Sequence, residues 1–204
     1  MKAIVKTARG PGLSIREVPV PSAGPGEALI RVKAAGICGT DAHIYEWNAW
    51  AQGRINPPIV IGHEFAGEIV ELGSQVKGYA KGDIVSAEGH ITCGHCVLCK
   101  TGQAHICREV SIIGVDRDGC FAEFIAMPAS NLWKIPREIP IEYGAIHDPL
   151  GNAFHTVLSA DIPGRRVMII GCGPIGLMAI GVARAAGAAL VIATETNALR
   201  RDLA

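Results

Sequence analysis

The chain has 204 residues, which is enough for one large domain or for one complete domain and part of a second. Lysine and arginine total 19, as do aspartate and glutamate, so no net charge draws nucleic acid or anionic lipid to the chain. The uncharged stretch 167–183 contains four glycines and a proline, which favours a buried strand, turn and helix over a membrane span. The composition therefore predicts a globular protein whose partners are small molecules and further subunits, not nucleic acid and not a membrane.

The first part of the chain is predicted to form short strands separated by turns. Apolar or alternating segments occur at 3–7, 28–34 and 65–72, and glycine- and proline-containing turns occur at 21–26 and 81–83. This pattern is typical of a β-rich, barrel-like domain, which we place at residues 1–150.

Two separated segments of this domain carry candidate metal ligands, Cys38 in the first and His63 with Glu64 in the second. Neighbouring strand residues point to opposite faces, so His63 and Glu64 can share an ion only if the backbone turns, which Gly62 permits. A thiolate, a neutral imidazole and a carboxylate balance the charge of Zn²⁺ and leave one position open, as in an alcohol-oxidising site. The alternatives are a buried free thiol and a hydrogen-bonded core histidine.

Asp148 is a further candidate for this site. As a fourth ligand it would make the site formally negative and weaken the activation of a bound hydroxyl, so we expect it beside the ligands or as a transient ligand.

Four cysteines lie within fifteen residues, at Cys93, Cys96, Cys99 and Cys107. Structural zinc sites use four sulfur ligands at about 2.3 Å, and two-residue gaps allow a short loop to wrap one ion. An iron–sulfur cluster is the main alternative, although the close fourth cysteine followed by proline is missing. Two disulfides fit less well, because seven cysteines is an odd number and residues 1–4 do not begin a signal peptide. We therefore expect a reducing, cytoplasmic compartment.

From residue 151 onward the pattern changes to alternating helices and buried strands. We expect the opening β-α-β of a doubly wound α/β domain over 151–204, with its elements at 152–159, 166–170, 175–186 and 190–194. Such domains usually have six strands, so the sequence predicts only the N-terminal part of one, as in a truncated chain.

Gly171, Gly173 and Gly176 form a G-x-G-x-x-G turn between a predicted strand and helix, the context in which this motif binds a dinucleotide. Glu195 follows Gly176 by 19 residues, close to the separation expected for the acid that binds the adenosine ribose. A carboxylate there favours NAD over NADP, whereas Arg200 nearby offers a partner for a 2′-phosphate. A glycine-rich turn with a surface glutamate is the structural alternative.

Together these segments resemble the zinc-containing medium-chain alcohol dehydrogenase family over essentially the whole chain. Four strings are most similar to the members that oxidise L-threonine: CGTDAHIYEW (38–47), EGHITCGHC (88–96), GCFAEF (119–124) and DPLGNAFHT (148–156). The resemblance implies a GroES-like catalytic domain, a Rossmann domain, a homotetramer and two zinc ions per subunit. It also implies that NAD⁺ oxidises L-threonine at C3 to 2-amino-3-oxobutyrate.

The same resemblance assigns roles to individual residues. It gives the catalytic zinc to Cys38, His63 and Glu64 and a proton relay to Thr40 and His43. Histidine titrates near neutrality and a threonine hydroxyl donates and accepts, so this relay is chemically sound. The resemblance also gives His90 a role in substrate choice and Asp148 a role in activity. It assigns contacts with the cofactor to Ile175, Glu195 and Arg200.

Several alternatives stay open at this level. The alternative interpretation of His90 is a surface histidine beside the cysteine loop. The alternative functions of the chain are a polyol or other secondary-alcohol dehydrogenase and a non-catalytic zinc- and nucleotide-binding module. The ligands at the catalytic position also accept cobalt or manganese. Relatives continue for well over a hundred residues, so if Ala204 is the terminus we expect weak NAD binding and little activity.

Overall fold

A computed structural model describes residues 1–204, which form two compact units, Met1–Ile146 and His147–Ala204. The expected boundary at 150 lies inside a helix, α5 (His147–Leu158), and the second unit begins where this helix begins. No helix has both the length and the apolar character needed to cross a bilayer.

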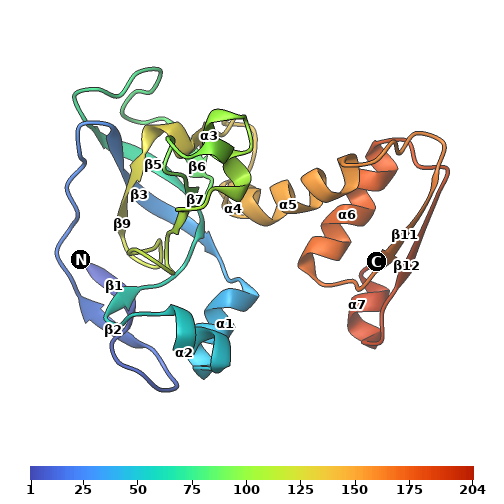
Figure 1. Ribbon diagram of the computed structural model, residues 1–204, viewed down its shortest axis with the longest axis horizontal. Coiled ribbons are helices and arrows are strands. Elements are labelled where there is room, and N and C mark those ends of the chain that lie inside the picture. The colour runs from blue at the N-terminus through green and yellow to red at the C-terminus, as the bar shows by residue number, and fades with distance from the viewer. The chain divides into compact units, whose positions relative to one another are not determined.

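The first unit is built on antiparallel sheets (Figure 1). The larger sheet has five strands in the order β10 (Leu132–Lys134), β6 (Ile84–Ala87), β5 (Glu64–Leu72), β3 (Glu27–Gly36) and β9 (Phe124–Pro128). The second sheet has the order β2 (Ser14–Glu17), β1 (Lys2–Lys6) and β4 (Ile59–Val60). A short ribbon pairs β7 (His90–Ile91) with β8 (Ser111–Ile112). The β-rich character expected from the sequence is confirmed, and the three predicted strands correspond to β1, β3 and β5.

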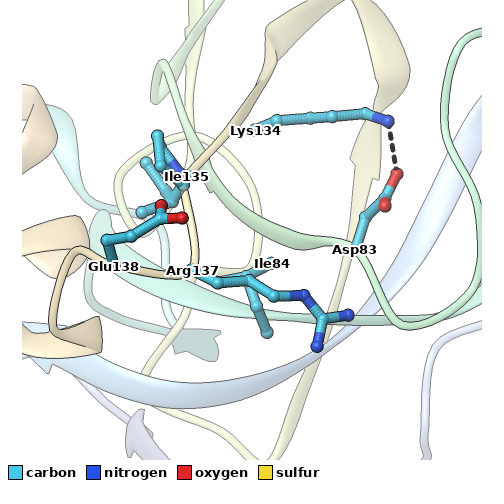
Figure 2. A pocket seen from close by; sticks show the side chains of 7 residues that line it. Asp83, Ile84, Lys134, Ile135, Arg137 and Glu138 are labelled. Carbon is cyan, nitrogen blue, oxygen red and sulfur yellow. Dashed lines mark ion pairs between the residues drawn. The ribbon is translucent and has the colours of Figure 1, made fainter.

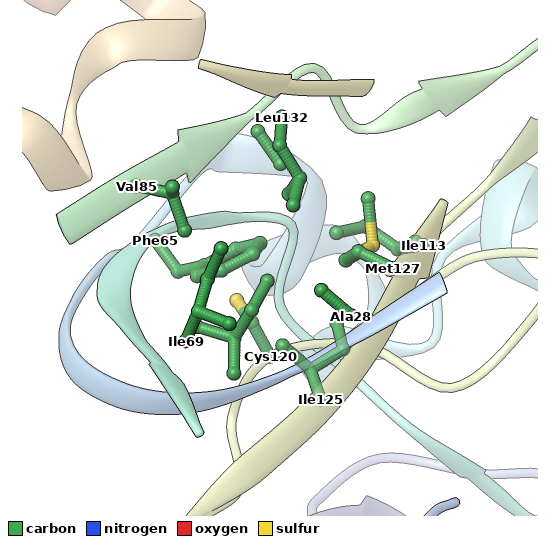
Figure 3. Close-up of a cluster of buried hydrophobic side chains, with 11 residues drawn as sticks. Ala28, Phe65, Ile69, Val85, Ile113, Cys120, Ile125, Met127 and Leu132 are labelled. Atoms are coloured by element: carbon green, nitrogen blue, oxygen red, sulfur yellow. The ribbon is translucent and has the colours of Figure 1, made fainter. Parts of the chain in front are cut away.

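A cluster of buried apolar side chains packs against the larger sheet of this unit (Figure 3). Its centre consists of fully buried side chains from several strands, among them Ile30, Phe65, Ile69, Val85 and Met127. Strands β3 and β5 supply four of its eleven buried residues, Ala28, Ile30, Phe65 and Ile69, so the core supports their pairing. Glu64 begins β5 and His63 directly precedes it, so this core also helps to position a candidate ligand pair.

Short helices connect the strands of the first unit. They are α1 (Gly39–Glu46), α2 (Ala49–Arg54), α3 (Val97–Lys100) and α4 (Ile141–Ala145), with 3₁₀ turns at Ala104–Ile106 and Ala129–Asn131. Helix α1 follows β3 directly, so the chain passes from Gly36 at the end of a core strand into the segment that carries Cys38 and Thr40.

The second unit contains the predicted β-α-β arrangement. Strands β11 (Arg166–Ile170) and β12 (Leu190–Thr194) pair in parallel, and helix α6 (Pro174–Ala185) connects them. Helix α5 packs on α6, and the helix α7 (Ala198–Asp202) follows β12. The small core is formed by Ala153, Val157, Ile162, Ala179 and Ala183. The two strands have the bounds expected from the sequence.

Candidate metal centres and dinucleotide-binding turn

Cys38, His63 and Glu64 come together in the first unit. Their ligand atoms all lie within 4.8 Å of one another, although Cys38 is 25 residues from His63 in the sequence. Zinc bonds to sulfur, nitrogen and oxygen are about 2.0–2.3 Å long, so one ion can reach all three groups. His63 and Glu64 are buried and Cys38 is partly buried, which suits a site that shields a cation from water.

Two glycines make this arrangement sterically feasible. Gly62 has φ = 91°, a left-handed conformation that turns the chain before His63, and a Cβ there would overlap the Phe121 ring. Gly36 pairs with Glu64 across β3 and β5, and a Cβ on Gly36 would overlap Oε2 of Glu64. A shift in strand register between Val32 and Ala34 precedes this pair. The end of β3 is therefore shaped to admit the Glu64 carboxylate.

Asp41 supports the same cluster, a role that the sequence analysis did not assign to it. Its Oδ2 accepts a hydrogen bond from the backbone N–H of Cys38 at 2.9 Å, which caps α1. Its Oδ1 lies 4.0 Å from Nδ1 of His63, and both atoms are buried without a hydrogen-bond partner. With Nδ1 turned toward Asp41, Nε2 is the nitrogen left to face Cys38. A carboxylate behind a ligating imidazole is the usual way to orient such a ring.

The electrostatics of the cluster favour charged forms in contact with one another. The hydrogen bond with His63 lowers the pKa of the Cys38 thiol, against burial, which raises it. Burial opposes a charge on His63, but Cys38 and Asp41 together raise the pKa of its ring. Burial raises the pKa of Asp41. In the absence of a cation, a Cys38 thiolate and a protonated His63 ring thus stabilise each other. A metal ion bound between them would replace the proton as the positive charge.

Thr40 and His43 lie three residues apart on α1, so they occupy neighbouring positions on one helix face. The Thr40 hydroxyl is 3.7 Å from the sulfur of Cys38. His43 is exposed, and Nδ2 of Asn48 lies 2.9 Å from its Nδ1. One of the two residues thus touches the candidate metal centre and the other faces solvent.

His90 lies on β7, in the segment that leads into the cysteine loop. Its Nδ1 is 2.6 Å from Oε1 of Glu88, which orients the ring. A Cβ on the neighbouring Gly89 would lie 3.4 Å from the carbonyl oxygen of His63, so this segment runs beside the ligand segment. Asp148, in contrast, lies in the first turn of α5 in the second unit, and its role remains a prediction.

The four cysteines of the loop converge at tetrahedral spacing. Sulfur–sulfur distances are 3.9 Å for Cys93–Cys99, 3.5 Å for Cys96–Cys99, 4.0 Å for Cys96–Cys107 and 3.5 Å for Cys93–Cys107. A tetrahedron with zinc–sulfur bonds of about 2.3 Å has edges of about 3.8 Å. All seven cysteines are free, and a disulfide needs sulfurs about 2.05 Å apart. The spacing fits one tetrahedral ion better than disulfides or a multi-iron cluster.

Backbone N–H groups point at these sulfurs. Cys93 N–H donates to Cys107 at 3.4 Å and Cys96 N–H donates to Cys93 at 3.3 Å. Hydrogen bonds from the backbone of Arg108 and then Cys99 lower the pKa of Cys96 to about 6, whereas burial raises the pKa of Cys99 to about 12. Four thiolates this close repel one another, so the loop needs a cation to hold them all deprotonated.

In the second unit the glycine turn lies between β11 and α6. Gly171 has φ = 94°, and a Cβ on Gly176 would overlap the Gly171 carbonyl oxygen. Gly173 is the N-cap of α6 and Pro174 occupies its first turn, where a missing N–H costs little. Ile175, another predicted contact, is exposed in this turn. The free N–H groups and partial positive charge of such a helix start suit a pyrophosphate.

Glu195 lies at the end of β12 and bonds back to the glycine turn. Its Oε2 accepts from the N–H of Cys172 at 2.9 Å, and its Oε1 accepts from the N–H groups of Thr196 and Asn197 at 2.8 and 2.9 Å. These bonds, that from Asn197 first, lower the pKa of Glu195 to about 2. Arg200 Nη1 is 4.0 Å from Glu195 Oε2. The carboxylate is thus charged at neutral pH and fixed beside the turn.

A separate pocket of about 400 Å³ lies between Asp83 and the segment 134–138 (Figure 2). Lys134 Nζ pairs with Asp83 Oδ2 across it at 2.8 Å, and this ion pair lowers the pKa of Asp83. None of the candidate site residues lines this pocket. Its charges neutralise each other, so we assign it no chemistry.

Comparisons with known proteins agree with this architecture. Residues 24–137 match the model of the alcohol dehydrogenase GroES-like domain, and the chain belongs to this family. Among curated proteins, the chain is 53% identical over all 204 residues to the L-threonine 3-dehydrogenase of Bacillus licheniformis. It is 55% identical, over the same length, to the L-threonine 3-dehydrogenase of Pyrococcus horikoshii. The chain spans 59% of the length of each relative.

Solved structures show the same fold. A protein from Sinorhizobium meliloti 1021, described as a zinc-binding dehydrogenase and bound to NADP, matches with a TM-score of 0.91 at 38% identity, over 99% of this chain and 58% of that one. The alcohol dehydrogenase of Thermus sp. ATN1 matches with a TM-score of 0.89 at 33% identity, over 100% of this chain and 60% of that one. These matches confirm the expected family and the GroES-like fold of the first unit.

Proposed function

We propose that the protein oxidises L-threonine at C3 to 2-amino-3-oxobutyrate and transfers the hydride to NAD⁺. The observation that carries this proposal is the convergence of Cys38, His63 and Glu64 beside the Thr40 hydroxyl. Relatives that are 53% and 55% identical and are named L-threonine 3-dehydrogenase support the choice of substrate. We also propose the homotetrameric assembly implied by the family resemblance, and a cytoplasmic location, which seven free cysteines support.

Cys38, His63 and Glu64 would hold the catalytic zinc, and Cys93, Cys96, Cys99 and Cys107 a structural one, giving two ions per subunit. When bound at the first site, zinc polarises a hydroxyl oxygen and lowers its pKa. Asp41 orients the His63 ring through Nδ1. The residues around the three ligands thus prepare a secondary alcohol for loss of its proton and hydride.

The proton and the hydride leave by different routes in this proposal. When bound, NAD⁺ would accept the hydride from C3, and loss of the hydroxyl proton would leave a ketone at that carbon. The hydroxyl proton passes to the Thr40 hydroxyl, then to His43 and out to solvent, so the reaction yields NADH and one proton. Thr40 suits the inner position because its hydroxyl lies 3.7 Å from the Cys38 sulfur. We assign His90 to substrate choice and Asp148 to activity, without direct metal ligation.

NAD⁺ would bind the turn formed by Gly171, Gly173 and Gly176, with Ile175 beside it. The charged Glu195 carboxylate would accept a ribose hydroxyl with its remaining lone pairs and repel the 2′-phosphate of NADP. Arg200 faces this carboxylate at 4.0 Å, and we assign it to the adenosine end of the cofactor.

The test is NADH formation by the protein with L-threonine, compared with sorbitol and 2,3-butanediol, and repeated with NADP⁺. We expect L-threonine with NAD⁺ to give the highest kcat/KM. Faster turnover of a polyol would instead identify a secondary-alcohol dehydrogenase of the same family.

Metal counting separates an enzyme from a non-catalytic module. We expect two zinc ions per chain, one lost in Cys38→Ser and the other lost in Cys93→Ser. A single ion that persists in Cys38→Ser and disappears in Cys93→Ser would support a zinc- and nucleotide-binding module without catalysis.

A further inference from the structure

The side chain of Asn48 is hydrogen-bonded at both ends. Its Oδ1 accepts from the N–H of Ala51 at 3.1 Å, which makes Asn48 the N-cap of α2. Its Nδ2 lies 2.9 Å from Nδ1 of His43. Because a backbone N–H can only donate, the cap requires an oxygen toward Ala51. The amide orientation is therefore settled by the cap, and the nitrogen is the end that faces His43.

This orientation has a consequence for the imidazole. An amide nitrogen donates hydrogen bonds and does not accept them, so Nδ1 of His43 must accept with its lone pair. A neutral imidazole carries one proton, which is then on Nε2. The Nδ2 group of Asn48 thus selects one of the two tautomers of the His43 ring.

The local backbone holds Asn48 in this position. Trp47 ends α1 in the left-handed conformation with φ = 58°, and its backbone N–H bonds to the His43 carbonyl. The N–H of Asn48 also donates to this carbonyl, at 3.3 Å. From α2, the Trp50 ring lies 6.3 Å from the His43 ring at an interplanar angle of 57°. The link between the two helices therefore serves as a support for the histidine ring.

We propose that Asn48 is a positioning residue that fixes the neutral His43 ring as its Nε2–H tautomer. This inference rests on the proposed function for its role in catalysis, since His43 is the outer member of the proton relay. In this tautomer Nε2 carries the proton and Nδ1 is occupied by the Asn48 donor, so His43 accepts the relayed proton only when its hydrogen bond to Asn48 opens.

The tautomer is measurable without any catalysis. In ¹⁵N spectra of histidine-labelled protein, at a pH that keeps the ring neutral, a protonated and an unprotonated ring nitrogen have widely separated shifts. His43 is assigned by the signals that disappear in His43→Gln. We expect the wild-type signals to show a proton on Nε2 and none on Nδ1.

Two variants keep the helix cap and change only the group that faces His43. Asn48→Asp offers a carboxylate oxygen, and Asp is as good an N-cap as Asn. We expect it to move the proton to Nδ1. Asn48→Ser also caps α2 but is too short to reach the ring, and we expect both tautomers to be populated. A wild-type ring protonated on Nδ1, or an Asn48→Asp ring that stays protonated on Nε2, would overturn the proposal.

Turnover then separates this inference from the proposed function. In Asn48→Asp the carboxylate accepts from Nδ1–H and Nε2 is left as a free acceptor for the relayed proton, so we expect kcat for L-threonine to rise, with KM and zinc content unchanged. If the tautomer changes as expected and kcat does not, the assignment of Asn48 stands and the relay through His43 is wrong. If L-threonine is not a substrate at all, the spectra still decide the tautomer.

Discussion

Oδ1 of Asp41 lies 4.0 Å from Nδ1 of His63, and neither buried atom has a hydrogen-bond partner. A buried carboxylate beside a buried imidazole is stable only when their charges are balanced by the surroundings. A cation bound on the other side of the ring would supply this balance, because it would polarise the imidazole and strengthen its attraction to Asp41.

Asp41→Asn should therefore weaken metal binding at Cys38, His63 and Glu64. The amide oxygen still caps α1, but the negative charge behind His63 is lost. We expect the affinity for zinc at this site to fall by about 10–100-fold, measured by competition with a chromogenic chelator.

Asp116→Asn is the matched control, since it removes a carboxylate of the same unit that pairs with Arg54 at 2.6 Å and does not face the cluster. It should leave zinc affinity unchanged. Equal zinc affinity in Asp41→Asn and the wild type would show that Asp41 does not support the metal.

Gly36→Ala should displace the Glu64 carboxylate without unfolding the first unit. The new methyl group would overlap Oε2 of Glu64, the movable end of a side chain, and Gly36 has no left-handed backbone angle to lose. We expect at least a tenfold loss of zinc affinity at this site, with secondary structure unchanged by circular dichroism. Gly26→Ala, where a Cβ meets no atom within 4 Å, is the control. Retention of both zinc ions by Gly36→Ala with normal affinity would remove Glu64 from the ligand set.

Glu195→Gln should destabilise the second unit in a pH-dependent manner. The pKa of Glu195 is lowered to about 2, compared with about 4.3 for an ordinary glutamate. A lowered pKa stabilises the fold above about pH 4.3, and this contribution is lost as the pH falls toward about 2. Thermal unfolding should give a lower Tm for Glu195→Gln at neutral pH, with the difference shrinking in acid.

Asp161→Asn serves as the comparison, because this carboxylate makes only an exposed pair with Arg165. Its Tm should follow that of the wild type at every pH. A Tm difference for Glu195→Gln that stays constant from neutral pH to about pH 2 would contradict the lowered pKa.

Lys6→Met should destabilise the first unit. Lys6 is only 1% exposed, its Nζ donates to the carbonyls of Gly10 and Gly12, and it lies 4.7 Å from the centre of the Trp47 ring. Methionine fills the same space but leaves the two carbonyls without this donor, which costs about 1–3 kcal/mol. Urea unfolding measures the difference.

Lys33→Met removes a lysine whose pair with Glu68 is exposed, and it should change the free energy of unfolding by about 1 kcal/mol or less. A loss in Lys6→Met no larger than that in Lys33→Met would mean that the buried ammonium contributes no more than a surface charge.

Local sequence determined much of this protein. The alternation of apolar and polar residues, with turn residues between, predicted β1, β3 and β5. The strand bounds of the β-α-β unit were also predicted correctly, because the spacing of apolar residues and the positions of glycines are local features of the sequence. The spacing of Cys93, Cys96, Cys99 and Cys107 likewise predicted a cluster, since short gaps leave a loop few ways to fold. The domain boundary expected at 150 lies inside a helix that begins at His147, with Asp148 and Pro149 in its first turn.

Only the tertiary structure decided which residues surround the candidate catalytic site. Cys38 meets His63 because β3 and β5 pair in one register, with a shift before Gly36, and nothing local to either segment specifies that register. Asp41 and Asn48 had local signals as helix caps, but their second contacts, to His63 and His43, depend on how a cap is placed against a neighbouring ring. Sequence thus identified the candidate ligands, whereas long-range strand pairing and the placement of the helix caps set their distances and partners.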